Sequence, residues 1–579
     1  MLTRKTVGIA ATAFVVVGLL LAGPSYSQVS DGAQQVVDTA GSDTTVVEAL
    51  VENLANHEDE QDYVWEDSDV NEIVLSDAGI VISGDGAVAD GNMVAILAAG
   101  TYRFRGTLTD GQIFVNSSEE GLVRLILNGI WLHCSSSAPI FIKNADKAIL
   151  VLAEDANNYV ADEAVRTVGD SEEDDPNAAI FSKENLTICG AGTLTVDANY
   201  ADGIVSKDGL VIAGGTILVT AADDGIRGKD YLVIEDANVT VTSVGDGLKA
   251  NNDTDAAAGY VLIEGGAVSV TAGGDAIVAQ TDALIAGGEI TLTSGGGSAK
   301  AVSSDVSAKG IKAGTSLIID GGTLTIDSSD DALHSSASLA INGGTFVITT
   351  GDDAIHADAA LGINGGDISI AKSYEGIESA SAIAINGGNI SIVSSDDGLN
   401  IAGGMDGSGW GGGPPGMPGG GPGGGQGGAP SSTSSSGCLY INGGYLMVQA
   451  VGDGMDINGS VVMTGGTLLV NGPTTNDNGA LDYDSVFKIT GGFLVAAGSS
   501  GMAQAPGTTS TQCSVLATLP STCQAGALFR IQARDGTDIL TFAPAVRYQS
   551  VAFSSPKLQK GTTYDVYYGG SSTGTPVDG

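Results

Sequence analysis

A 22-residue repeat runs through the middle of this chain and limits the folds open to it. Gly-Gly pairs begin at residues 321, 343, 365 and 387, each 22 residues after the last, and the step from Gly443 to Gly465 is again 22. An Ile-Asn or Ile-Asp dipeptide precedes each of the first four pairs. A repeat of this length is one supersecondary unit that cannot bury its apolar face alone, so stacked copies must share a core.

A second motif recurs in the same phase. It consists of an acidic residue, a small residue, an aliphatic residue and a variable, usually polar residue. It begins at Asp202, Asp224, Asp246, Asp275, Asp331, Asp353, Glu375, Asp397 and Asp453, with Lys309 at the same phase. Two motifs that keep one phase over about 250 residues indicate a regular stack of similar units.

The residues between these motifs read as short β-strands. Segments such as 345–349 and 367–370 alternate β-branched apolar and polar residues, and each ends at Gly, Asn or Asp. Two or three such strands with tight turns account for 22 residues, and parallel coils stack about 4.8 Å apart with right-handed connections. The sequence therefore predicts an all-β, right-handed parallel β-helix of about 22 residues per coil. The asparagines at 342, 364, 386 and 442 share one column, which suggests a ladder of side-chain amides.

The flanks of the array predict the organisation of the chain. Arg4 and Lys5 precede an apolar run from Val7 to Ala22, which predicts a signal peptide over 1–27 rather than a membrane anchor, because the run is short for a span. Residues 28–70 are acidic, with a short helix expected within 44–56. The β-helix follows over 71–524 and includes a Gly/Pro-rich loop at 403–436. Residues 525–579 are expected to form a small C-terminal β cap.

Export and charge limit the possible partners. A signal peptide predicts a mature protein that does not span the membrane and is secreted, extracellular or held at the cell surface, where disulfides are allowed. Whether Cys513 and Cys523 pair is left open. The formal net charge of −45 argues against nucleic-acid binding, because phosphates need a basic surface. It suits cations instead.

Stacking turns the acidic motif into a column of carboxylates. Neighbours about 5 Å apart repel by roughly 1 kcal/mol in water and about 3 kcal/mol at an effective dielectric near 20. Calcium is the natural occupant outside the cell, since it accepts six to eight oxygen ligands. The candidate metal ligands are Asp202, Asp223, Asp224, Asp246, Asp330, Asp331, Asp352, Asp353, Asp396 and Asp397. The alternative is that Asp is a solvated turn residue that recurs because the coil recurs.

Two histidines, His334 and His356, are stacked neighbours 22 residues apart. A transition-metal pair is one interpretation. Their column elsewhere contains Arg227, Lys249 and Glu378, and this variability favours a solvent-facing position.

Three segments carry a resemblance to a known family. They are residues 99–113 (AGTYRFRGTLTDGQI), residues 123–129 (VRLILNG) and residues 553–564 (FSSPKLQKGTTY), with the Asn-Gly-Gly coils between them. Over roughly 70–570 the chain resembles a family of secreted bacterial carbohydrate-binding β-helix proteins, described as binding cellulose and acidic sugars. That resemblance implies a pectate-lyase-like fold and bound calcium.

Three functions remain open at this stage. The favoured one is a non-catalytic binder of plant-type or acidic polysaccharide, with Trp410, Tyr374 and Tyr231 as aromatic sugar platforms and calcium in the Asp columns. Scattered aromatic residues favour acidic glycans over cellulose. The second is a calcium-dependent, pectate-type polysaccharide lyase with Lys249 as the base. The third is a structural surface or adhesion protein.

Overall fold

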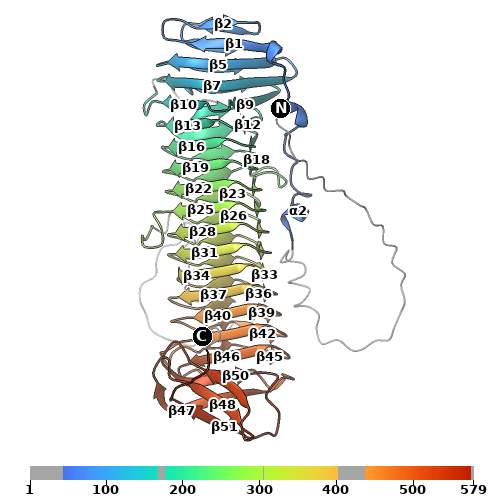
Figure 1. Cartoon of the computed structure of the whole chain (residues 1–579), viewed down its shortest axis with the longest axis vertical. Helices are drawn as coiled ribbons and strands as arrows, with labels where there is room; N and C mark the ends of the chain where they lie inside the picture. Colours follow the sequence, from blue (N-terminus) through green and yellow to red (C-terminus); the bar gives the residue numbers. More distant parts are fainter. Residues whose placement is uncertain (1–43, 167–175, 304–305, 402–436, 576–579) are drawn as a thin grey trace, which may run out of the picture.

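The computed structural model describes residues 44–166, 176–303, 306–401 and 437–575. The predicted signal peptide and the Gly/Pro-rich loop, with Trp410, lie outside the described residues. Within them the chain forms an elongated parallel β-helix, whose coils follow one another from β2 at one end to β46 near the other (Figure 1). The predicted parallel β-helix is confirmed.

Each regular coil contributes three strands to three parallel sheets. In one 22-residue coil these are β31 (Thr345–Thr350), β32 (Ile355–Ala357) and β33 (Ala360–Ile363). Each pairs in parallel with the equivalent strand of the next coil. We call the three sheets the long-strand face, the short-strand face and the third face.

The long-strand face contains β10 (Asn157–Asp162), β13 (Thr193–Ala198), β16 (Thr216–Ala221), β19 (Asn238–Ser243), β22 (Ala267–Ala272), β25 (Glu289–Ser294), β28 (Thr323–Ser328), β31, β34 (Asp367–Ser373), β37 (Asn389–Ser394), β40 (Tyr445–Gln449), β43 (Thr467–Asn471) and β46 (Phe493–Gly498). The short-strand face contains β3 (Ala87–Asp90), β4 (Met93–Ile96), β6 (Gln112–Asn116), β8 (Ile140–Asn144), β11 (Ala178–Ser182), β14 (Asp202–Ser206), β17 (Ile226–Gly228), β20 (Leu248–Ala250), β23 (Ile277–Ala279), β26 (Ile311–Ala313), β29 (Leu333–Ser335), β32, β35 (Ile377–Ser379), β38 (Leu399–Ile401), β41 (Asp456–Ile457) and β44 (Asp482–Tyr483). The third face contains β9 (Lys147–Leu152), β12 (Leu186–Gly190), β15 (Gly209–Ile212), β18 (Tyr231–Ile234), β21 (Tyr260–Ile263), β24 (Ala283–Ile285), β27 (Ser316–Ile319), β30 (Ser338–Ile341), β33, β36 (Ala382–Ile385), β39 (Gly437–Ile441), β42 (Gly459–Met463) and β45 (Phe487–Ile489).

The core is a set of stacked aliphatic ladders. On the short-strand face one ladder places Ile226, Leu248, Ile277 and Ile311 in register, each fully buried. Full burial of such a side chain contributes about 1.5–3 kcal/mol, so repetition along the axis stabilises every coil in the same way.

Turns between the third and long-strand faces explain the Gly-Gly pairs. The second glycine has positive φ in consecutive coils, as at Gly344 (104°) and Gly366 (98°), a region that favours glycine. The asparagine before the pair bonds to its neighbour. Asn364 Nδ2 donates to Asn342 Oδ1 at 2.7 Å, and Asn386 Nδ2 donates to Asn364 Oδ1 at 2.8 Å. The predicted amide ladder is confirmed.

Antiparallel strands close both ends. At the N-terminal end β1 (Val70–Leu75) pairs with β2 (Val81–Ser83), and β5 (Gly100–Leu108) and β7 (Leu122–Cys134) follow. At the other end β50 (Tyr548–Ser554) pairs with both β46 and β47 (Ser514–Cys523). Beyond them β48 (Phe529–Ala533), β49 (Asp538–Phe542) and β51 (Tyr564–Tyr568) form a separate sheet. The terminal β unit therefore begins at Ser514, earlier than the expected 525, because β47 and β50 cover the edge of the last coil. The five cysteines are free thiols, so Cys513 and Cys523 do not pair.

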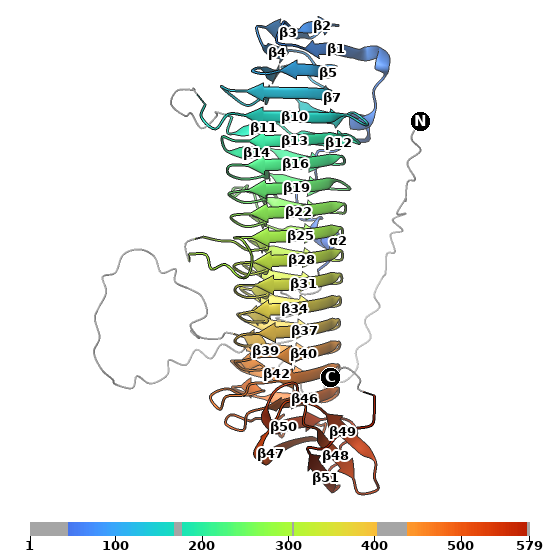
Figure 2. The ribbon, with the colours of Figure 1, turned by 60° about the vertical axis from the view of Figure 1, so that its left-hand side comes forward.

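Residues 44–69, which we call the strap, lie along the third face (Figure 2). The strap contains α2 (Val46–Ala49) and two 3₁₀ turns, Glu60–Tyr63 and Asp67–Asp69. Within 44–56 only one helical turn forms, because the backbone that follows bonds to the coils instead. Leu54 N–H donates to Ala257 O at 2.6 Å, and the Leu54 carbonyl accepts the Tyr260 hydroxyl at 2.8 Å.

Candidate functional site

The acidic motif forms two adjacent columns along the short-strand face. The carboxylate column consists of the residues that open the motif: Asp202, Asp224, Asp246, Asp275, Lys309, Asp331, Asp353, Glu375, Asp397 and Asp453. The strand column consists of the residue three positions later in each coil: Val205, Arg227, Lys249, Val278, Lys312, His334, His356, Glu378, Asn400 and Asp456. Register between successive coils therefore places these side chains one above the other.

The carboxylates support the coil that follows. Asp224 Oδ1 accepts the N–H of Asp246 at 2.9 Å, and Asp246 Oδ1 accepts the N–H of Asp275 at 2.9 Å. Asp275 Oδ1 accepts the N–H of Lys309 at 2.8 Å. Aspartate recurs here partly because its short side chain satisfies a backbone donor that no strand would satisfy. One carboxylate oxygen thus has a structural role, and the other is left for the strand column.

In the first half of the columns, positive side chains occupy that second oxygen. Arg227 contacts Asp202 Oδ2 at 2.5 Å, and Lys249 Nζ lies 2.9 Å from Asp224 Oδ2 and 2.8 Å from Asp246 Oδ2. This charge pairing already offsets the repulsion that calcium was expected to relieve at Asp202, Asp224 and Asp246.

Lys309 pairs with carboxylates in the same way, two coils after Lys249. Its Nζ lies 2.9 Å from Asp330 and 2.6 Å from Asp331. Asp352 offers a carboxylate oxygen within 4.8 Å of one oxygen of each member of this pair. The residue is exposed, but partial desolvation of its carboxyl group, followed by the charge of Asp353, raises its pKa to about 7. Of the doubled positions, Asp223 is exposed and Asp396 is half-buried.

The second half of the columns carries no basic residue. From Glu375 to Asp456 the two columns contain only carboxylates and one asparagine in the described residues. Burial, followed by the charges of neighbouring acids, raises the pKa of Glu375 to about 10. Burial in the same way raises the pKa of Asp397 to about 8 and of Asp453 to about 7. These carboxyl groups therefore favour the protonated form, and a bound cation would favour the ionised form instead.

Three of these residues form what we call the Asp397 cluster: Asp397, Asp453 and Asp456. Each offers one carboxylate oxygen, and the three oxygens lie within 4.8 Å of one another. All are hard oxygen donors, which fits calcium, and the remaining three to five coordination positions suit water or a ligand carboxylate. Asp397 is among the predicted ligands. Asp453 and Asp456 are not among the predicted ligands, although both occupy the same positions in the repeat as the residues of the two columns.

Tyr374 lies beside this cluster. Its side chain is 39% exposed, and it is hydrogen-bonded to the side chain of Asp396, which helps to raise the pKa of Tyr374. The Tyr374 carbonyl also accepts the N–H of Asp396 at 3.0 Å. The predicted aromatic platform is therefore adjacent to the carboxylates that lack basic partners in the two columns.

The prediction for Tyr231 was wrong. Tyr231 is 2% exposed, because the strap covers it, and its hydroxyl lies 2.8 Å from His57 Nδ1. Its ring stacks on Tyr260 at a centroid distance of 5.4 Å, inside the cluster that contains Val46 of the strap. A ring buried under the chain's own N-terminal segment cannot serve as a sugar platform.

A second exposed aromatic surface lies near the N-terminal end. Trp131 on β7 is 39% exposed and stacks on Tyr159 of β10, with centroids 5.5 Å apart and planes 18° from parallel. Tyr159 donates its hydroxyl to Asp197 Oδ2 at 2.7 Å. We call this pair the Trp131 platform. The sequence did not predict that Tyr159 pairs with Trp131, because β7 and β10 lie outside the Gly-Gly repeat and no period indicated their register.

Lys249 is poorly suited to be a lyase base. Burial alone would lower its pKa, but hydrogen bonds and charges from Asp246 and Asp224 outweigh burial and raise the pKa. A base must give up its proton near neutral pH, and this lysine is held in the protonated form.

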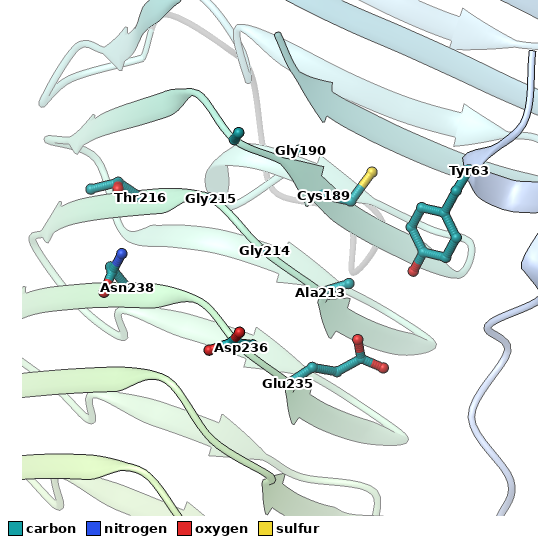
Figure 3. Close-up of a pocket in the computed structure, with 11 residues that line it drawn as sticks. Tyr63, Cys189, Gly190, Ala213, Gly214, Gly215, Thr216, Glu235, Asp236 and Asn238 are labelled. Atoms are coloured by element: carbon teal, nitrogen blue, oxygen red, sulfur yellow. The ribbon is translucent and has the colours of Figure 1, made fainter. Parts of the chain in front are cut away.

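A groove of about 520 Å³ lies between the strap and the turns that join the third and long-strand faces. Its floor is made of small residues such as Gly190, Gly214 and Gly215, with Tyr63 on the strap side and Glu235 and Asp236 beside it (Figure 3). The groove is lined by one aromatic ring and two acidic residues, with no column of carboxylates. It is therefore a weaker candidate for a calcium and glycan site than the Asp397 cluster.

Comparisons with known proteins bear on this site. Residues 90–354 match the family model described as carbohydrate-binding domain-containing protein. The middle of the chain resembles a carbohydrate-binding family. The resemblance predicted from the sequence is thereby confirmed, and the matched stretch includes the Trp131 platform and much of both columns.

Two individual relatives were found. A carbohydrate-binding domain-containing protein of Acetivibrio thermocellus is 39% identical over 137 residues, which cover 24% of this chain and 48% of the relative. The matched part thus spans about half the length of that relative. A solved polysaccharide lyase-like protein from C. thermocellum, a gadolinium derivative, shares 28% identity and covers 51% of this chain and 96% of its own, with a TM-score of 0.36. No helix among the described residues has the length and hydropathy needed to cross a bilayer.

Proposed function

We propose that this chain is a secreted, non-catalytic polysaccharide-binding protein that holds acidic glycans through calcium. The carbohydrate-binding family matched by residues 90–354 supports the ligand class. The observation that carries the calcium and acidic-sugar part is the pairing of an exposed ring, Tyr374, with carboxylates that have no basic neighbour in their columns.

The Asp397 cluster would bind the ion. Its carboxylates supply three oxygens, and calcium commonly uses six to eight, so a uronate carboxylate together with water can complete the shell. Tyr374 would then lie against the apolar face of the sugar ring. Bound calcium supplies the positive charge that an acidic glycan needs on a protein with a net charge of −45.

The Trp131 platform would serve a different part of the ligand. The two rings are nearly parallel and stacked, with centroids 5.5 Å apart. The exposed part of Trp131 offers an apolar surface to a neutral sugar, and Asp197 fixes the Tyr159 ring behind it. This surface supports binding of a neutral glucan such as cellulose alongside acidic sugars.

A binding assay with and without calcium tests the proposal. We expect the protein to bind polygalacturonate when calcium is present and to lose this binding when a chelator is added. The absorbance of unsaturated products should not rise in either condition. Asp453→Asn should weaken calcium-dependent binding by about tenfold or more, because one charged ligand is removed. Asp90→Asn, an exposed carboxylate at the far end of the same face, should leave it unchanged.

Other outcomes favour the other functions. Unsaturated product that Lys249→Ala abolishes would make the chain a lyase. Absence of binding to acidic and neutral glycans alike, with a folded protein, would favour a structural surface protein.

A further inference from the structure

The histidine pair is not the solvent-facing feature that its variable column predicted. His334 is 9% exposed, and its ring lies 4.9 Å from that of His356. Glu378 and Asn400, the next two members of the strand column, are 6% and 1% exposed. The column varies in charge because its members face the carboxylate column at close range, and not because they face water.

His356 Nδ1 lies within 4 Å of three carboxylates. It is 3.5 Å from Asp353 Oδ2, 3.6 Å from Asp331 Oδ2 and 3.8 Å from Glu378 Oε2. Ligands bound to one tetrahedral ion at about 2.0–2.1 Å are separated by about 3.3–3.4 Å. The distance of 3.5 Å between His356 Nδ1 and Asp353 Oδ2 is close to that separation, so these two atoms have room for a shared ion.

The other ring nitrogen has a partner of its own. His356 Nε2 lies 3.3 Å from Asp358 Oδ1, and that carboxylate is not part of the ring around Nδ1. Metal-binding histidines almost always donate their second N–H to a carboxylate, carbonyl or water, which fixes the tautomer and aims the free nitrogen at the metal. Asp358 is placed to do this.

The neighbouring charges distinguish the carboxylates around His356. Lys309 Nζ lies 2.6 Å from Asp331 Oδ2, and His334 Nδ1 lies 2.9 Å from the same oxygen, so Asp331 is already engaged. Asp353 and Glu378 each offer one oxygen within 4.8 Å of a His356 nitrogen, and of each other.

We propose that His356 Nδ1, Asp353 Oδ2 and Glu378 Oε2 bind a divalent transition-metal ion, with Zn²⁺ the best fit and water in the fourth position. An imidazole nitrogen with carboxylate oxygens suits zinc and its neighbours, whereas calcium prefers oxygen alone. The site therefore differs in chemistry from the Asp397 cluster, and its existence is independent of the proposed glycan function.

Metal titration tests the proposal. Full-length protein is stripped with chelator and titrated with Zn²⁺ against a chromophoric competitor, in excess calcium so that all-oxygen sites are filled. We expect one strong equivalent, lost in His356→Gln and weakened about 10–100-fold in Asp358→Asn. His133→Gln, a histidine on β7, should bind as the wild type. Cobalt in place of zinc should give the intense visible bands of a tetrahedral site.

The competing arrangement is an imidazolium that simply balances the surrounding carboxylates. In that case no zinc binds above the level of His356→Gln, and NMR shows both His356 nitrogens protonated whether or not zinc is present; either result would overturn the proposal. If His356→Gln does not fold, the cobalt spectrum and the NMR signals of the wild type decide. Zinc binding can fail while calcium-dependent glycan binding persists, so the two proposals fail separately.

Discussion

Asp246 joins two coils through one carboxylate. Its Oδ1 accepts the backbone N–H of Asp275 at 2.9 Å, while its Oδ2 accepts a hydrogen bond from Lys249 Nζ at 2.8 Å. The inner oxygen continues the backbone hydrogen bonding between coils, and the outer oxygen belongs to the charged surface. Asp397 holds the next coil in the same way, since its Oδ1 accepts the backbone N–H of Asp453. The inner oxygen therefore serves stability in both halves of the column, and among the described residues only the first half pairs the outer oxygen with a lysine or arginine.

Asp246→Ala should release the amide of Asp275. A buried donor without an acceptor costs about 1–3 kcal/mol, so hydrogen exchange at Asp275 should accelerate about tenfold or more. Asp246→Asn keeps an acceptor oxygen and should have a smaller effect. Asp223→Asn, at an exposed carboxylate one coil earlier, is the control. Equal exchange rates in the Ala and Asn variants would show that the inner oxygen does not hold the coil.

Stability should fall as pH rises in the absence of divalent cations. Glu375, Asp397 and Asp453 have pKa values raised to about 10, 8 and 7, whereas in the unfolded chain they titrate near 4. Between pH 4 and these raised values the folded state binds more protons than the unfolded state. The contribution of these three groups to the free energy of unfolding is therefore complete below about pH 4 and is lost progressively towards pH 8–10.

Thermal midpoints from pH 5 to 9 measure this slope. Glu375→Gln should flatten it, because the glutamine cannot ionise, and millimolar calcium should restore stability at pH 8 in the wild type. A midpoint that rises over this range would contradict the raised pKa values.

The amide ladder should contribute in proportion to the bonds removed. Asn364 donates to Asn342 and accepts from Asn386, while Thr464 donates one bond to Asn442 at 2.8 Å. At about 1 kcal/mol for each bond, Asn364→Ala should cost roughly twice as much as Thr464→Val in urea unfolding. Equal costs would indicate that the ladder follows the coil without stabilising it.

Trp131→Ala should weaken binding of neutral glucan and leave calcium-dependent binding of polygalacturonate in place. Loss of one aromatic stack costs about 0.5–1.5 kcal/mol, or roughly a two- to tenfold loss of affinity. Tyr567→Ala, at a ring 51% exposed in the C-terminal sheet, is the matched control. If both variants bind cellulose equally, the Trp131 platform is not the neutral-sugar surface.

The sequence predicted what repetition determines. The 22-residue phase placed the strands, the glycine turns, the amide ladder and the carboxylate column, because in-register stacking turns sequence period into spatial neighbourhood. The same phase placed Lys249 near Asp246, but it did not predict that the lysine would pair with both Asp224 and Asp246.

The errors come from contacts between residues far apart in the sequence. Tyr231 is buried because the strap, about 170 residues earlier, returns to cover it. The register of Trp131 and Tyr159 is set by irregular coils that have no period. The burial of His334 depends on how closely two columns face each other, and a variable column does not reveal that distance.

Crystals grown with calcium and an oligogalacturonide provide the most direct test, through an anomalous difference map. We expect a calcium peak within about 2.3–2.6 Å of carboxylate oxygens of Asp397, Asp453 and Asp456, with a uronate oxygen in the same shell and a sugar ring against Tyr374. An empty Asp397 cluster, with the oligosaccharide bound elsewhere and no ion beside it, would contradict the calcium-bridged binding proposed for this chain.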